Sequence, residues 1–208
     1  MDGDLWSAYI VLDVHKADDK RLATIRSAMR TMAGGPGMLW LGLRNSKQKP
    51  RNGAGDDKAV AVLTTLLHEA DVTGIEIALY PHNGFWLETC DDALRLCKRL
   101  QHQRLGMCFN LCHFLRTNEQ HGASDLLKRC GKQLFAVTIN GADNDGKDWS
   151  TLIQPLGQGS WDLRKFLSVL DDVPFDGPIG LQGYGIRQSP NEHLPASMAA
   201  WRAAQKGW

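Results

Sequence analysis

Apolar and polar positions alternate along this chain in two periods, one typical of strands and one typical of helices. Seven short apolar segments are predicted to be strands, and they cover 5–13, 38–43, 74–80, 104–111, 134–140, 151–157 and 177–184. Elsewhere apolar residues recur at spacings of three and four, which predicts amphipathic helices at 18–32, 57–70, 88–100, 123–131, 162–170 and 190–204. This alternation of strand and helix indicates an α/β protein with a parallel sheet and helices outside it.

Two architectures fit such an alternation, an open doubly wound sheet and a closed (β/α) barrel. A doubly wound nucleotide-binding sheet needs a glycine-rich turn after its first strand, and the segment HKADDK that follows residue 14 has no glycine. Polar residues instead follow the carboxyl ends of many strands: Asp13, Arg44, Tyr80, Asn110, Asn140 and Gln182. A TIM-type barrel builds its active site from those ends, so this pattern favours the barrel.

We expect one barrel domain over residues 1–208, with seven strand–helix units and the first unit apparently missing. A barrel of this type has eight units and typically about 250 residues. The first unit is then absent, supplied by another chain, or encoded upstream of Met1. Because an open barrel leaves two unpaired edges, we expect strands 5–13 and 178–184 to pair directly or to be buried in a symmetric homodimer.

The composition indicates which kinds of binding partner and which cellular compartment to expect. The formal net charge is +1, which gives no reason to expect nucleic acid or an anionic membrane as a partner. No apolar run reaches 18 residues, and the start MDGDLW lacks the pattern of a signal peptide. The 5 cysteines include no CxxC pair. We interpret them as reduced thiols of a cytoplasmic protein.

Hydrogen-bonding side chains at the strand ends are the candidate site. We expect Tyr80, His82, Asn110, His113, Asn140 and Gln182 to line one pocket, with Trp86 and Trp149 in nearby loops where an indole can stack on a sugar. Amides both donate and accept hydrogen bonds, which suits sugar hydroxyls. Histidine is the side chain that can exchange a proton near neutral pH, so His82 and His113 are the candidate catalytic groups. The alternative interpretation is that His82 braces a loop and that the amides satisfy backbone groups.

Five local motifs occur in an order that resembles a known family. The stretches IALYPH, FNLCHF, VTINGAD, PLGQGSWD and FDGPIGLQGYG are similar to I-A-L-E-P-H, F-D-x-x-H, V-H-x-x-D, P-L-G-x-G-x-x-D and Y-x-G-x-I-x-x-E of the xylose isomerase-like barrels. That family includes sugar phosphate isomerases and epimerases, inosose dehydratases and, more distantly, endonuclease IV. The resemblance implies a barrel that acts on a sugar or sugar-like small molecule.

The same resemblance puts the family's metal site in question. Its members hold a divalent cation with a Glu, an Asp, a His and a Glu, and the matching positions are Tyr80, Asn110, Thr138 and Gln182. All four ligands are replaced, and the amides keep the shape of two carboxylates without their charge. We therefore expect no tightly bound metal and no other cofactor.

Three hypotheses about function follow. The chain is an isomerase, epimerase or lyase that acts on a sugar-like substrate, with His82 and His113 as proton-transfer groups. Alternatively, it is a catalytically inactive barrel that binds a sugar or a partner domain. In the third hypothesis it is the truncated product of a gene whose full form has the first unit.

Overall fold

The computed structural model describes residues 5–117 and 122–205 and divides into two compact units. Unit 1 is Met1–Cys108 and unit 2 is Phe109–Trp208, so the boundary falls inside a strand, β4 (Leu105–Asn110). The acidic residues 1–4, on which part of the signal-peptide argument rests, lie outside the described residues.

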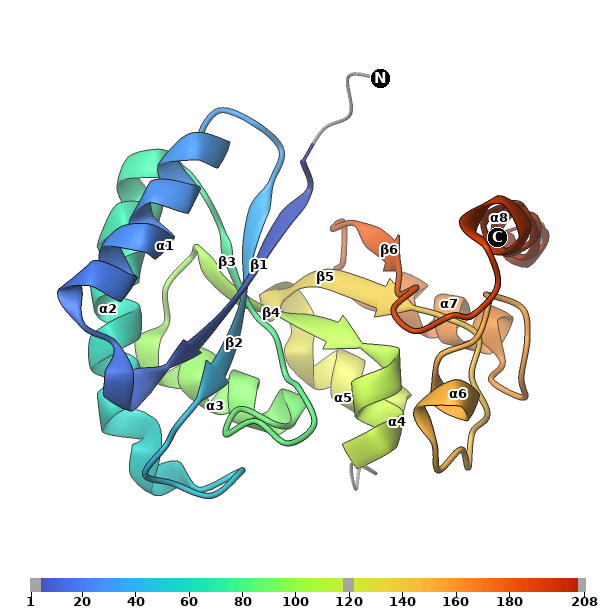
Figure 1. Cartoon of the computed structure of the whole chain (residues 1–208), viewed down its shortest axis with the longest axis horizontal. Helices are drawn as coiled ribbons and strands as arrows, with labels where there is room; N and C mark the ends of the chain where they lie inside the picture. Colours follow the sequence, from blue (N-terminus) through green and yellow to red (C-terminus); the bar gives the residue numbers. More distant parts are fainter. Residues whose placement is uncertain (1–4, 118–121, 206–208) are drawn as a thin grey trace. The chain divides into compact units, whose positions relative to one another are not determined.

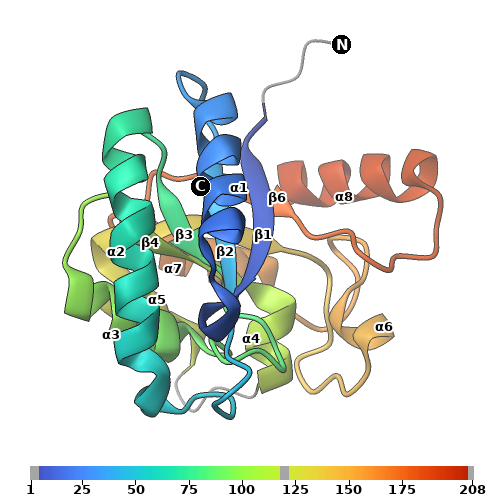
Figure 2. The same cartoon turned by 60° about the vertical axis from the view of Figure 1, so that its left-hand side comes forward.

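Unit 1 is a parallel sheet whose strands follow the order of the chain. Its strands are β1 (Ser7–Asp13), β2 (Met38–Arg44), β3 (Ile77–Leu79) and the first part of β4. Its helices are η1 (Val14–Lys16), α1 (Asp19–Met32), η2 (Gly53–Gly55), α2 (Asp56–Thr73) and α3 (Cys90–Leu100). Helices α1 and α2 lie side by side along one face of the strands (Figure 1), and Figure 2 shows the same pair from the side.

The register of the strands assigns side chains to two different faces. Tyr9, Trp40 and Ala78 lie opposite one another in neighbouring strands, so they share one face, and their chain neighbours point to the other face. That other face includes Leu39, Leu41, Leu43, Ile77 and Leu79, all fully buried. Continuous burial of this kind is expected where helices cover a parallel sheet.

The helix ends of unit 1 follow signals that the sequence carries. Asp18 precedes α1, and its side chain accepts a hydrogen bond from the N–H of Arg21. Helix α3 begins with a capping box between Thr89 and Asp92. Helix α2 continues to Thr73, beyond the predicted end at 70, because Gly74 adopts φ 76° and ends it in a left-handed conformation.

In its described part, unit 2 contains the remaining strands and five α-helices. Its elements are α4 (Leu111–Thr117), α5 (Ala123–Cys130), η3 (Gly131–Gln133), β5 (Leu134–Ile139), α6 (Trp149–Leu152), α7 (Leu163–Asp171), β6 (Ile179–Leu181) and α8 (Pro190–Gln205). Strands β5 and β6 pair in parallel, with Thr138 opposite Gly180. Asp162 caps α7 by accepting from the N–H of Lys165, as the sequence predicts.

The predicted strand at 151–157 is wrong. The segment begins inside α6, and its contribution to pairing is an isolated antiparallel bridge between Gly141 and Gln154. Asp148 and Thr151 form a capping box that starts a helical turn, and Pro155 has no N–H for a strand ladder. The described residues therefore contain six strands, one fewer than predicted.

Candidate functional site

Tyr80 follows β3 and belongs to an aromatic cluster in unit 1. Its ring stacks on Trp40 with centroids 5.7 Å apart, and the ring of Tyr9 lies 4.9 Å away. The N–H of Tyr80 donates to the carbonyl of Leu41, which ties the strand end to β2. The phenol is buried and held on two sides by other rings.

His82 lies two residues further on, half-buried against Phe85. The two rings stack with centroids 4.0 Å apart, and His82 Nδ1 lies 2.8 Å from the carbonyl oxygen of Asn83. A carbonyl oxygen only accepts, so Nδ1 carries the proton in this tautomer and Nε2 is the basic nitrogen. Burial lowers the pKa of His82; the hydrogen bond to Asn83 raises it and the positive charge of Arg44 lowers it. A neutral imidazole with a basic Nε2 suits a general base.

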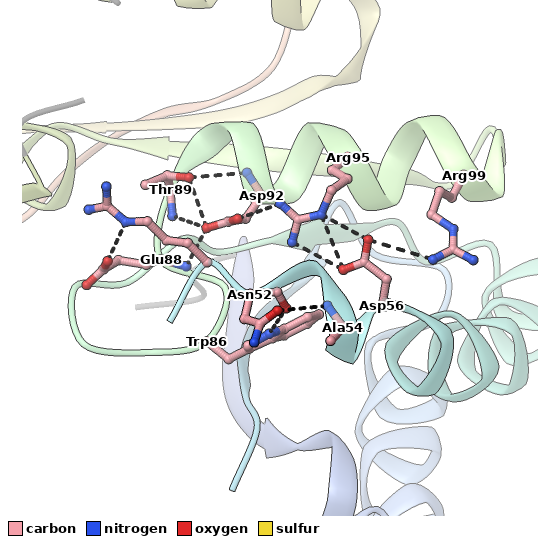
Figure 3. A network of polar contacts seen from close by, with 10 residues as sticks. Asn52, Ala54, Asp56, Trp86, Glu88, Thr89, Asp92, Arg95 and Arg99 are labelled. Atoms are coloured by element: carbon pink, nitrogen blue, oxygen red, sulfur yellow. Dashed lines mark hydrogen bonds and ion pairs between the residues drawn. The ribbon is translucent and has the colours of Figure 1, made fainter. Parts of the chain in front are cut away.

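Trp86 holds two loops of unit 1 together. Its indole N–H donates to the carbonyl of Asn52 at 2.8 Å, and its ring is packed so closely against Gly55 that an added Cβ there would lie 2.8 Å from Cζ2 (Figure 3). Only 2% of Trp86 is exposed. This burial favours a structural role for Trp86 over stacking on a sugar.

An ion-pair network joins the first turns of α2 and α3 beside that indole. Arg95 Nε lies 2.9 Å from Asp56 Oδ2, and Arg95 Nη1 lies 2.6 Å from Asp92 Oδ1 (Figure 3). The other oxygen of Asp92 accepts from the backbone N–H groups of Glu88 and Thr89. The network fixes both helix starts and, through them, the loops that follow β2 and β3.

Asn110 and His113 occupy the start of α4 in unit 2. Asn110 Oδ1 accepts from the N–H of His113 at 3.2 Å and from the thiol of Cys112 at 2.9 Å, so the amide caps the helix. The ring of His113 meets that of Trp149 edge-on, with centroids 5.5 Å apart. Trp149 is 42% exposed, and the guanidinium of Arg116 lies 5.6 Å from its ring centroid. Trp149 therefore presents ring surface next to His113.

Asn140 and Gln182 are neighbours at the ends of β5 and β6. They follow the last paired residues, Ile139 and Leu181, and the N–H of Gln182 donates to the carbonyl of Ile139. Asn140 Nδ2 donates to two carbonyls, those of Gly141 and Leu152, each at 2.7 Å. These bonds fix the orientation of the amide. Its Oδ1 is buried and has no hydrogen-bond partner in the described part of the chain.

His193 is a buried polar residue that the sequence reasoning missed. It lies on α8 with its Cε1 3.8 Å from the Cβ position of Gly183, directly after Gln182. Its Nδ1 is buried without a partner in the described residues. Ser197, one turn later, accepts from the N–H of Leu156. Two polar residues spaced by four on one face of a helix are the signal that could have identified this face.

Comparison with known protein families matches residues 15–204 to the xylose isomerase-like TIM barrel. The chain belongs to that family. The six strands of the described residues and the parallel pairing within each unit agree with a (β/α) barrel. No curated protein matches the chain.

Several solved structures of this xylose isomerase-like barrel type are similar to the chain. The 3-keto-D-glucoside 4-epimerase YcjR from E. coli, in its apo form, has 18% identity and a TM-score of 0.73, over 98% of this chain and 79% of that one. A barrel protein from Mycobacterium smegmatis in complex with magnesium has 17% identity and a TM-score of 0.71. The match covers 98% of this chain and 72% of that one. The D-allulose 3-epimerase from Methylomonas sp., in complex with D-allulose, has 18% identity and a TM-score of 0.60. The match covers 91% of this chain and 65% of that one. At such identities the likeness shows the fold alone.

The positions that match the metal ligands of xylose isomerase-like barrels do not fit a divalent cation here. Asn110 and Gln182 are uncharged, and their oxygens already accept backbone N–H groups. The hydroxyl of Thr138 lies 3.5 Å from a carbonyl oxygen, and Tyr80 is a phenol in an aromatic stack. Hard cations favour several charged oxygens. Within 5–117 and 122–205, no three His, Cys, Asp or Glu side chains gather where they could hold a metal ion.

The cysteines near the candidate residues are buried thiols. Cys108 and Cys112 are fully buried, and neither forms a disulfide. Burial raises the pKa of Cys112 to about 12, which keeps the thiol protonated at neutral pH. A protonated thiol is a poor nucleophile and a poor metal ligand.

In the described residues, no helix is long and apolar enough to span a bilayer.

Proposed function

We propose that this barrel acts on a carbohydrate-like small molecule in the manner of a sugar isomerase or epimerase, without a tightly bound divalent cation. The observation that carries the proposal is the pair of amides at the ends of β5 and β6. Asn140 presents a fixed, buried acceptor that has no partner within 5–117 and 122–205, and Gln182 is its neighbour in the sheet. Buried acceptors are costly when unsatisfied, so a ligand hydroxyl is a fitting donor.

The proposal gives the other strand-end residues roles that their surroundings support. Trp149 offers exposed ring surface for the apolar face of a sugar, next to His113. His82, with its lowered pKa and basic Nε2, accepts a proton from the substrate. His113 is the second proton-transfer group. Asn110 acts through the helix cap that positions His113.

Two of the structural neighbours support the same chemistry. They are named as a 3-keto-D-glucoside 4-epimerase and a D-allulose 3-epimerase, and the second was solved with D-allulose. Both reactions invert a centre that carries a hydroxyl group. A barrel with amides at its strand ends is suited to hold such hydroxyls.

Calorimetric titration with a panel of neutral ketoses and ketoglycosides tests the binding step. We expect saturable binding of at least one sugar, weakened about tenfold in Gln182→Ala, since one hydrogen bond to a hydroxyl contributes about 1 kcal/mol or more. Gln188→Ala is the matched control, because Gln188 is an exposed glutamine in the loop after β6. Equal binding by both variants would remove the amide pair from the site.

The alternative is a catalytically inactive barrel that binds a sugar or a partner domain. Replacement of all four matching ligand positions, Tyr80, Asn110, Thr138 and Gln182, favours this alternative. NMR of the bound sugar in D₂O separates the two. Deuterium entering the carbon next to the carbonyl, lost in His82→Gln or His113→Gln, supports an enzyme. Binding without exchange supports the inactive barrel.

The homodimer expected from the missing first unit remains a proposal. Strand β1 exposes Tyr9 and Val11, and β6 is partly exposed along its length, as at Leu181. A symmetric dimer that covers these strands would give twice the monomer mass in light scattering of dilute protein. A monomer mass would contradict the homodimer and favour the alternative, in which the two strands pair directly.

A further inference from the structure

One arginine of unit 1, Arg44, belongs to the same sheet face as Tyr9 and Trp40, the face opposite the buried Leu39, Leu41 and Leu43. Tyr80 stacks on Trp40, and its ring is tilted against that of Tyr9. Arg44 is the last residue of β2, and its Cζ lies 4.3 Å from the ring centroid of Phe85. The cluster thus places a cation at the carboxyl end of β2, where barrels bind their ligands.

The charge of Arg44 is not neutralised by this protein's carboxylates. Arg44 has neither a hydrogen bond nor an ion pair in the described residues, and its recorded contact is the cation–π contact with Phe85. Asp13 is its neighbour in the register, yet Asp13 Oδ1 instead accepts from the backbone N–H groups of His15 and Ser46. The contact places the guanidinium carbon over the ring of Phe85 and leaves the five N–H donors available to another molecule.

The groups around Arg44 are donors as well. The hydroxyl of Tyr9 has no hydrogen-bond partner in the described residues, and the side chain is 46% exposed. It lies beside Gly42, where an added Cβ would come within 3.2 Å of the hydroxyl and 3.1 Å of Phe85. The indole nitrogen of Trp40 is also buried without a partner. A cation near unpaired donors, with no carboxylate in the described residues paired to it, is complementary to an anion.

We propose that Arg44, with the hydroxyl of Tyr9, binds an anionic group of the ligand, a phosphate or a carboxylate. The carbohydrate part of that ligand rests on the proposed function; the anion site itself does not. The named sugars of the structural neighbours, a 3-keto-D-glucoside and D-allulose, carry no such group, so the inference comes from this chain's own residues.

Titration with inorganic phosphate and with acetate tests the anion site without knowledge of the sugar. NMR of the arginine side-chain N–H groups reports the binding. We expect a saturable shift of Arg44 with at least one anion, and an affinity at least about tenfold weaker in Arg44→Met, since a charge-assisted contact contributes about 1.4 kcal/mol or more. Tyr9→Phe should weaken binding by a smaller factor, and Arg44→Lys should retain part of it.

Arg21→Met is the matched control, because Arg21 is an exposed arginine on α1 of the same unit. Its affinity for either anion should equal that of the unchanged protein. The proposal is overturned if neither anion gives a saturable shift of Arg44, or if Arg44→Met binds both as tightly as the control.

A second titration separates the two sources of the anion. Fructose 6-phosphate and glucuronate are compared with fructose and glucose, and the tighter anionic ligand identifies the group as phosphate or carboxylate. Neutral sugars that bind as tightly as both anionic ones, with no effect of Arg44→Met, would overturn the anion site and leave the proposed function intact. If the anionic sugar instead binds equally well to the unchanged protein and to Gln182→Ala, the anion site stands and the proposed function is overturned.

Discussion

At the scale of single residues, Asn140 is held by two hydrogen bonds that only an amide N–H₂ can donate. Asn140→Asp would place a carboxylate oxygen against the carbonyls of Gly141 and Leu152 in a site that is 1% exposed. We expect the free energy of unfolding at neutral pH to fall by at least about 2 kcal/mol in denaturant titrations. Asn144→Asp, at an exposed asparagine that donates to Ser160, should cost about 1 kcal/mol or less.

His82 is a second residue with a defined expectation. Its pKa is lowered from 6.5 by burial, so the unfolded chain binds a proton more readily than the folded one. The stability that the neutral ring contributes is therefore present above about pH 6.5 and is lost as the pH falls through the folded-state pKa. Because Arg44 lowers this pKa, Arg44→Met should raise it, as followed by proton NMR of the imidazole. An unchanged or lower pKa in that variant would contradict the electrostatic coupling.

The sequence identified residues by type and position, and burial decided what each of them does. His82, Asn140 and Gln182 were predicted at strand ends, where the structure has them. Trp86 was predicted to stack on a sugar from the same kind of loop, but its depth and its bond to Asn52 depend on a loop 34 residues away. His193 was missed because its partners, Gly183 and the strand ends, are distant in sequence.

At the scale of elements, the network between α2 and α3 has the strongest energetic consequence. Arg95→Met would leave the buried carboxylate of Asp92 without this cation and that of Asp56 with the longer ion pair to Arg99, at 3.7 Å. We expect a loss of about 2–4 kcal/mol in the free energy of unfolding, below the upper range for buried pairs because Arg95 is partly exposed. Thermal and denaturant unfolding measure it.

Arg99→Met is the control for that change on the same helix. Arg99 pairs chiefly with Asp57, whose side chain is 92% exposed, so the loss should be about 1 kcal/mol or less. Equal losses for Arg95→Met and Arg99→Met would show that the buried carboxylates do not depend on Arg95.

Helices and strands were predicted correctly where the spacing of apolar residues and the helix-capping residues indicated the same element. The prediction was wrong where these two signals indicated different elements. The helix of α7 was predicted from Asp162 and begins there. The segment 151–157 has the apolar residues of a strand, but the capping box of Asp148 and Thr151 and the presence of Pro155 give it a helical turn and a loop. Local hydrogen bonds of side chains thus outweighed hydrophobicity in a short segment.

At the scale of the whole molecule, the chain is a xylose isomerase-like TIM barrel whose matching ligand positions lack carboxylates. Asn110→Asp together with Gln182→Glu should restore two charges while keeping the hydrogen bonds that both oxygens accept. We expect this double variant to bind Mn²⁺ measurably more tightly than the unchanged protein in calorimetry. One equivalent of zinc or manganese in the dialysed, unchanged protein would contradict the absence of a tight site.

The most direct test of the account is a calorimetric titration of the tightest-binding sugar into chelator-treated protein, repeated after addition of Mn²⁺. In the proposed function, Asn140, Gln182 and Trp149 recognise the sugar, and none of them needs a cation to form its contacts. We therefore expect saturable binding in the chelator, with an affinity that Mn²⁺ changes by less than about threefold, a difference under 1 kcal/mol. Binding that vanishes in the chelator and returns with Mn²⁺ would contradict it.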